Sequence, residues 1–446
     1  MNSLDVRHEL PYIPFGPFKI RLPFFHYKIE KVEFIQGLVL GVTGLSSVPY
    51  LMEYLGLPYE IAWSCVIIDV FLYILHGFLG DPVVPGWITP TLPLTIIYLQ
   101  GYEMGPERIQ AMIALQILVG IVFIFMGITK MADKFVHVIP NSIKGGILLA
   151  APITVMGGQL GEGQSFSKYP ISIIAGVGLL LLISFSDKYQ ELRKNSKFLD
   201  LIARYGNLFP YLLAMVVGLV MKEIATPVVT GENMIKLPEF SNIISQISIF
   251  GVGIPSFRYF VDALPLALVC YVIAFGDFIT SETLIKEASE ARKDEIIDFN
   301  SSRSNLVSGI RNIILGIFAP FPPLSGPLWV GMTVSVSMRY KEGKAAMKSL
   351  LGGMASFRIA TFFSVICVPV VMFFKPLFPI GASITLVFQA FVCARIGMDY
   401  CKTDRDKMIA GVMAAVLAVR GSAWALGVGI ALNILLSNIE INKNEN

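Results

Sequence analysis

The stretch FAPFPPLSGPLWVGM, residues 318–332, places four prolines and two glycines within an otherwise apolar part of the chain. A second stretch, VVPGWITPTLPLTII (83–97), has the same character. Proline removes a backbone donor and kinks or breaks a helix, and glycine permits dihedrals and close approaches that other residues avoid. In a soluble protein such a stretch indicates a surface turn, so its meaning depends on the sequence around it.

The composition is that of a membrane protein. Of 446 residues, 54% are hydrophobic and 15% are charged, and the mean hydropathy is +0.68. Soluble domains carry about 25% charged residues. Apolar runs such as 108–128 and 351–373 are long enough to cross a hydrocarbon core of ~30 Å, which takes about 20 helical residues. The net charge of +3 gives no nucleic-acid signal. We therefore expect an integral protein of the lipid bilayer with no nucleic-acid partner.

Residues typical of enzymes, metal sites and cofactor sites form no pattern. The five cysteines and four histidines are scattered, which predicts neither a disulfide framework nor a metal site. No Walker lysine is present for ATP binding. We expect no enzyme activity, no metal and no cofactor.

Apolar runs between helix breakers predict fourteen membrane spans. Lysine and arginine concentrate in cytoplasmic loops, and they fall in alternate loops when the N-terminus is placed inside, as with Lys188, Arg193, Lys194 and Lys197. This pattern predicts a protein of the plasma membrane, such as a bacterial inner membrane, with both termini cytoplasmic.

Fourteen spans divide into two units of seven, and an odd-numbered unit repeated in tandem enters the membrane from opposite sides. The two interrupted stretches fall in the third and tenth spans, at the same place in each half. The predicted division is a membrane-surface N-terminal segment (1–32), a first repeat (33–221), an extracytoplasmic connection (222–262), an inverted second repeat (263–437) and a short cytoplasmic tail (438–446).

Broken spans at matching positions indicate a binding place. Irregular backbone survives in hydrocarbon only where protein or a polar cavity surrounds it. Two half-helices that begin near the membrane centre present free amides and positive dipole ends to a common point. Such a point suits an anionic or carbonyl-bearing solute; the alternative is a pair of ordinary kinks.

Several segments resemble one superfamily, that of the uracil/xanthine permeases (nucleobase:cation symporter 2), sulfate permeases (SulP) and bicarbonate exchangers. They are FIQGLVLGVTGLSSVP (34–49), LPLALVCYVIAFGDFITSETLIK (264–286), GIRNIILGIFAPFPPLSGP (309–327) and IDFN (297–300). The resemblance implies an all-α fold of fourteen transmembrane segments as two inverted seven-span repeats, with interrupted spans 3 and 10, core and gate domains, and a homodimer. It also indicates a divergent member without the C-terminal STAS domain.

The chain departs from the nucleobase permeases at two positions. Their base-binding glutamates, in spans 8 and 10, align with Ile273 and Leu328. The expected substrate therefore stays open between a nucleobase-like compound and a small inorganic or organic anion such as sulfate.

The residues expected to carry transport follow from depth and resemblance. Asp277 lies deep in span 8, with Thr280 and Ser281 on the same helical face, and intramembrane charge usually serves a function. The resemblance places Asp277 where uracil permeases carry a proton-coupling histidine, which implies coupling to H+ or Na+. The candidate substrate-binding residues are Gln36, Thr43, Ser46, Ser47, Thr89, Thr91, Ser325, Gly326 and Trp329.

Four further polar residues in predicted spans receive a structural interpretation. Asp69 and His76 share a helical face and are expected to form a structural pair, with a proton relay as the alternative. Arg311 and Arg358 are expected to snorkel or to pair with carboxylates, with a role in the site as the alternative.

The sequence predicts a secondary active transporter, a permease or symporter that moves a small polar or anionic solute by alternating access. One alternative is an intramembrane aspartyl protease, suggested by AFGDF (274–278), although these proteases need Gly-x-Gly-Asp and position 274 is alanine. The other alternative is a passive anion channel.

Overall fold

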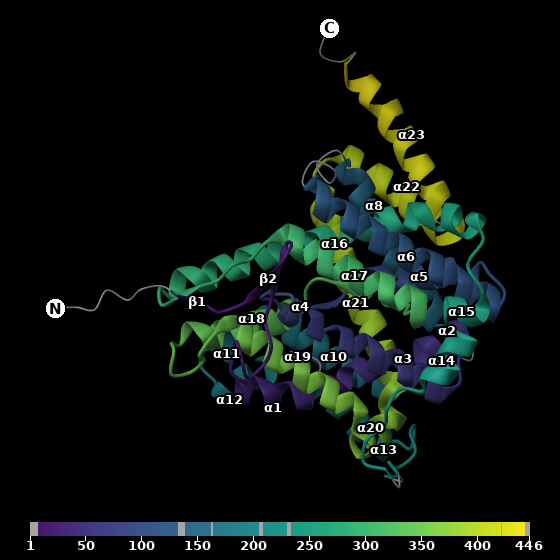
Figure 1. The fold of residues 1–446 in the computed structure, drawn as a ribbon. Helices are drawn as coiled ribbons and strands as arrows, with labels where there is room; N and C mark the ends of the chain where they lie inside the picture. Colours follow the sequence, from purple (N-terminus) through teal and green to yellow (C-terminus); the bar gives the residue numbers. More distant parts are fainter. Residues whose placement is uncertain are drawn as a thin grey trace.

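The computed structural model describes residues 8–132, 139–161, 164–204, 208–229, 233–420 and 422–441 (Figure 1). Parts of the predicted division lie outside the described residues: 1–7 of the N-terminal segment, 133–138, 162–163 and 205–207 of the first repeat, 230–232 of the connection, 421 of the second repeat and 442–446 of the tail. The described chain is mostly helical, with a few short strands.

The elements before the connection are β1 (His8–Glu9), β2 (Ile13–Phe15), β3 (Phe18–Ile20), α1 (Lys31–Leu40), η1 (Gly41–Ser47), α2 (Val48–Leu55), α3 (Tyr59–Leu72), α4 (Ile74–Phe78), β4 (Gly86–Trp87), η2 (Thr89–Thr91), α5 (Leu92–Gln100), α6 (Pro106–Thr129), α8 (Asn141–Gln159), α9 (Ser165–Lys168), α10 (Pro170–Phe185), α11 (Asp187–Lys194), α12 (Lys197–Arg204) and α13 (Leu208–Val220). The elements that follow are α14 (Phe240–Gln246), α15 (Ile249–Val252), α16 (Phe257–Ala291), β5 (Glu295–Ile296), α17 (Ser301–Phe318), β6 (Ser325–Gly326), α18 (Val330–Lys341), α19 (Leu350–Ile366), α20 (Val368–Phe374), η3 (Lys375–Leu377), α21 (Phe378–Tyr400), α22 (Asp404–Arg420) and α23 (Ser422–Ile441).

The described residues contain five helices that are long and apolar enough to cross a membrane, or up to seven if each bent helix pair is one span. The two bent pairs are α10 with α11 and α12 with α13. Shorter apolar helices, such as Leu350–Ile366, add to these, and the fourteen spans stay a prediction. The apolar helices agree with an integral membrane protein.

The two interrupted stretches meet, as the sequence predicts. Strands β4 and β6 pair antiparallel, with Gly86 opposite Gly326. Glycine is required there, because a Cβ atom on Gly326 would lie 2.8 Å from the backbone nitrogen of Ile88. The Ile88 amide donates to the Leu324 carbonyl at 3.1 Å, and the Trp329 amide donates to the Val84 carbonyl at 2.6 Å. These hydrogen bonds supply partners to backbone groups that have none within a helix, because the prolines interrupt it.

The paired strands β4 and β6, called the crossing strands below, lie within a first group of helices. Helix α6 packs on α16 and α17, and α1 packs on α19, which also contacts α3 (Figure 1). Close contact of α6 with α17 depends on small residues, because a Cβ atom on Gly120 would lie 2.9 Å from the Gly309 carbonyl oxygen. Helix α18 packs against α16 and α19.

The remaining long helices form a second group. Helix α8 packs on α21 and α22, α22 packs on α23, and α10 packs on α13 and α21. In Figure 1, α8, α22 and α23 lie together at the top, away from α1 and α19. The two groups enclose the cavity described below.

Candidate functional site

A cavity of about 640 Å³ lies where the crossing strands face the second helix group. The first group contributes Tyr73, Trp87 and Arg358 to its wall, and the second contributes Leu180 and Phe388. The charged side chains in the wall are Arg193, Asp277 and Arg358. The cavity is large enough for a small solute and its water.

Arg358, on α19, is the most unusual side chain of this cavity. It is 3% exposed, and its Nε and Nη2 atoms are buried with no hydrogen-bond partner. The described residues give it no ion pair. Arg358 therefore does not show the expected pairing with a carboxylate among the described residues, and its place in the cavity wall fits the alternative of a role in the site. A buried cation without a counter-ion is unfavourable, so an anion bound beside Arg358 would be stabilised.

Aromatic rings hold Arg358 in place. Its guanidinium carbon lies 4.0 Å from the centre of the Tyr73 ring and 5.0 Å from the centre of the Trp329 ring. Tyr73 lies between α3 and α4, and Trp329 precedes α18. Ring faces attract a cation without neutralising its charge. The aromatic contacts thus orient Arg358 at the wall of the cavity without supplying a negative charge.

A buried ion pair lies behind this site. Arg311, on α17, approaches Asp69 on α3 with an Nη2 to Oδ1 distance of 3.6 Å, and both side chains are fully buried. Arg311 also donates to the Gly326 carbonyl at 3.1 Å, and the Trp87 indole donates to Asp69 at 2.9 Å. The pair expected for Arg311 is present, and it fixes both crossing strands to α3 and α17.

His76 belongs to the same buried cluster. Its Nε2 atom lies 3.3 Å from Arg311 Nη1, and its Nδ1 atom lies 2.8 Å from Asp81 Oδ2. Because arginine is only a donor, Nε2 accepts and Nδ1 carries the proton that Asp81 accepts. The expected partners Asp69 and His76 therefore meet through Arg311 and not directly.

The N-terminus of α18 also borders the cavity. Val330, Gly331 and Met332 form its first turn and line the wall. The first N–H groups of a helix have no intrahelical acceptor, and the helix dipole is positive there. Around Gly331, nothing lies within 4 Å of an added Cβ. This helix end and Arg358 present positive potential to the same space.

The structure brings five of the predicted site residues to the cavity: Thr43, Ser46, Thr89, Asp277 and Trp329. The others are not part of its wall: Gln36, Ser47, Thr91, Thr280, Ser281, Ser325 and Gly326. Asn312 fixes the position of Ser325 by bonding its carbonyl at 2.8 Å and its amide at 3.0 Å, and Gly326 lies in the strand crossing.

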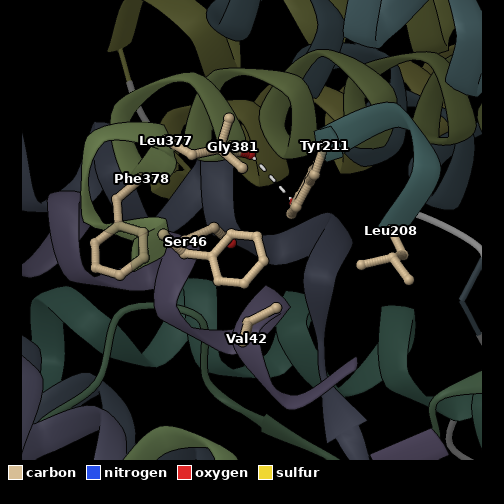
Figure 2. A pocket seen from close by; sticks show the side chains of 8 residues that line it. Val42, Ser46, Leu208, Tyr211, Leu377, Phe378 and Gly381 are labelled. Carbon is tan, nitrogen blue, oxygen red and sulfur yellow. Dashed lines mark hydrogen bonds between the residues drawn. The ribbon is translucent and has the colours of Figure 1, made fainter. Parts of the chain in front are cut away.

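Most predicted hydroxyls bond to their own backbone. Thr43 donates to the Leu40 carbonyl at 2.8 Å, and Ser46 donates to the Thr43 carbonyl at 2.8 Å. Ser46 also lines a second cavity of only about 10 Å³, shown in Figure 2 with Tyr211 and its bond to Gly381. That space holds about one water, so the larger cavity is the candidate site.

Within the described residues, no group of three or more histidine, cysteine, aspartate or glutamate side chains could hold a metal ion.

Solved structures of transporters resemble the chain over most of its length, and two of them are as follows. The murine Solute Carrier 26 family member A9 (Slc26a9) anion transporter in the inward-facing state matches with a TM-score of 0.55 and 13% identity, over 93% of this chain and 70% of that chain. The transmembrane domain of a cyanobacterium bicarbonate transporter, BicA, matches with a TM-score of 0.50 and 14% identity, over 90% of this chain and 99% of that chain. No protein-family model and no curated protein matches the sequence. The chain has the fold of these transporters, which confirms the expected resemblance at the level of fold.

Proposed function

We propose that the protein is a secondary transporter that moves a small anion across the membrane by alternating access. The observation that carries this proposal is the side chain of Arg358, which is buried, lines the cavity beside the crossing strands and has no ion pair among the described residues. A transported anion supplies the negative charge that this arginine lacks. The likeness to the Slc26a9 anion transporter and to BicA, a bicarbonate transporter, supports the same class of substrate.

The cavity favours an anion over a nucleobase. Leu328 lines the wall at the position of one base-binding glutamate, and the other position holds Ile273. Two of the three charged side chains in the wall are arginines. The substrate we propose is therefore a small inorganic or organic anion.

We propose further that Asp277 couples the anion to a proton. Asp277 lines the same cavity as Arg358, and an ionised carboxylate there opposes the entry of an anion. Protonation of Asp277 removes that opposition, so that one proton enters with each anion. Thr280 bonds to the Gly276 carbonyl at 2.8 Å, which leaves the coupling role to the carboxylate.

The finer architecture is part of the proposal. We propose two inverted seven-span repeats, 33–221 and 263–437, in a homodimer of the bacterial inner membrane with both termini cytoplasmic. The matching places of the crossing strands β4 and β6 support this arrangement.

Uptake into proteoliposomes tests the function. The panel contains bicarbonate, sulfate, nitrate, dicarboxylates and nucleobases, with and without a pH gradient. The proposal expects saturable uptake of one anion class, and Asp277→Asn is expected to abolish the response to the gradient while anion exchange continues. Saturable nucleobase uptake, or non-saturable flux typical of a channel, would contradict the proposal.

A further inference from the structure

Residues 8–30, which precede α1, are folded against the helices. Its β2–β3 hairpin pairs Ile13 with Ile20. The Lys19 amino group contacts Glu9 at 2.6 Å and Asp298, in the connection between α16 and α17, at 2.7 Å. The Arg21 amide donates to the Phe78 carbonyl at 2.8 Å. The segment is therefore held in one position at the ends of α4 and α16.

One loop of this segment exposes two aromatic rings. Phe24 is 79% exposed and Phe25 is 83% exposed. Hydrogen bonds close the loop, from the Phe24 amide to the Tyr27 carbonyl at 2.9 Å and from the His26 amide to the Leu22 carbonyl at 3.0 Å. Phe24 has a φ of 69°, a left-handed conformation that strains an aromatic residue. A strained turn that exposes two phenyl rings indicates a surface that another apolar phase covers.

The loop lies at the level where two membrane helices begin. Tyr27 is buried against Leu351 and Ala355 in the first two turns of α19. Helix α1 starts six residues after Phe25 and exposes an apolar stripe to its surroundings, formed by Val32, Ile35, Leu38 and Val39. In an integral membrane protein this stripe faces lipid, so the phenyl rings continue a lipid-facing surface toward the headgroups.

Basic residues accompany the two rings. Lys28 and Lys31 are exposed, and the described residues give neither of them an ion pair. Aromatic rings favour the membrane–water boundary, and lysines beside it attract anionic headgroups.

We infer that Phe24 and Phe25 insert into the leaflet at which α1 begins and that Lys28 and Lys31 bind anionic phospholipid headgroups beside them. The loop anchors the folded N-terminal segment, and through Lys19 and Asp298 the connection between α16 and α17, to the bilayer surface. This anchor is independent of the anion site.

A fluorophore on a cysteine at position 25 (Phe25→Cys) tests the insertion in proteoliposomes. Four of the five native cysteines are buried, and Cys367→Ser removes the remaining one. The matched control is a label on Lys344→Cys, in the exposed connection after α18. Lipids brominated on their acyl chains are expected to quench the label at 25 at least about twofold more than the control label.

Quenching of the label at 25 by aqueous iodide, to the same extent as the control, would overturn the inference. Protection from both quenchers would also overturn it, because a protein surface such as a second copy of the chain would then cover the loop.

Two further variants separate anchoring from folding. Phe24→Gly relieves the strained turn, so the thermal midpoint is expected not to fall. Quenching of the label at position 25 by brominated lipids is expected to fall, and unchanged quenching would contradict a role for the Phe24 ring. Phosphatidylglycerol added to phosphatidylcholine is expected to increase the quenching, and Lys28→Gln with Lys31→Gln is expected to abolish that increase. An increase that persists in the double variant would contradict the headgroup contact.

Discussion

Replacing Arg358 with glutamine removes the charge that we assign to the anion. Each charge-assisted hydrogen bond contributes about 1.5–3 kcal/mol, and Arg358 lines the cavity with no ion pair among the described residues. A loss of about 3 kcal/mol, the upper end of that range for one such bond, corresponds to an increase of ~100-fold in Kd. Arg358→Lys keeps the charge but loses the planar fork and its stacking, so its affinity is expected to fall between the two.

The assay is isothermal titration of the purified protein with the anion that proteoliposome uptake selects. Arg395→Gln is the matched control, because Arg395 stacks on Phe185 at 5.7 Å and is not part of the cavity wall. Arg358→Gln breaks no ion pair among the described residues, so the thermal midpoint is expected to stay or rise. An Arg358→Gln protein that binds the anion with unchanged Kd would refute the reasoning.

Three other predictions concern stability. Arg311→Gln leaves a buried carboxylate unpaired and is expected to reduce the free energy of unfolding by about 3–5 kcal/mol; an unchanged denaturation midpoint would contradict the buried pair. Gly326→Ala forces a Cβ atom against the backbone of β4 and is expected to cost about 1–3 kcal/mol, whereas Gly331→Ala, which meets nothing within 4 Å, is expected to change little in the same assay. Burial by itself raises the pKa of Asp298, but the hydrogen bond from Lys19 helps to hold this pKa below its ordinary value of 3.8. The stability that Asp298 contributes is therefore present above pH 3.8 and is lost as the pH falls through the lowered pKa. The difference in thermal midpoint between the wild type and Asp298→Asn is therefore expected to shrink on acidification, and a difference independent of pH would contradict the ion pair.

The meeting of the two interrupted stretches is predictable from sequence. Proline and glycine mark where a helix cannot continue, and irregular backbone in hydrocarbon needs a partner. Two such stretches at equal places in the two halves therefore supply each other with hydrogen bonds, as β4 and β6 do. The register that opposes Gly86 to Gly326 follows from their missing side chains.

The key side chain of the site is not predictable in the same way. Arg358 depends on Tyr73 and Trp329, which approach it from other elements, and a sequence pattern along one helix cannot identify such contacts. The presence of an arginine within a predicted span was the available signal. The hydroxyls of Thr43 and Ser46 were easier to propose, but serine and threonine often bond to a carbonyl of their own helix, and these two do.

Anomalous diffraction from crystals soaked in bromide or selenate tests the central claim most directly. The account predicts an anion peak in the large cavity, within hydrogen-bond distance of the Arg358 guanidinium and beside the first turn of α18. Peaks confined to the protein surface, in crystals of a protein that transports the soaked anion, would contradict it.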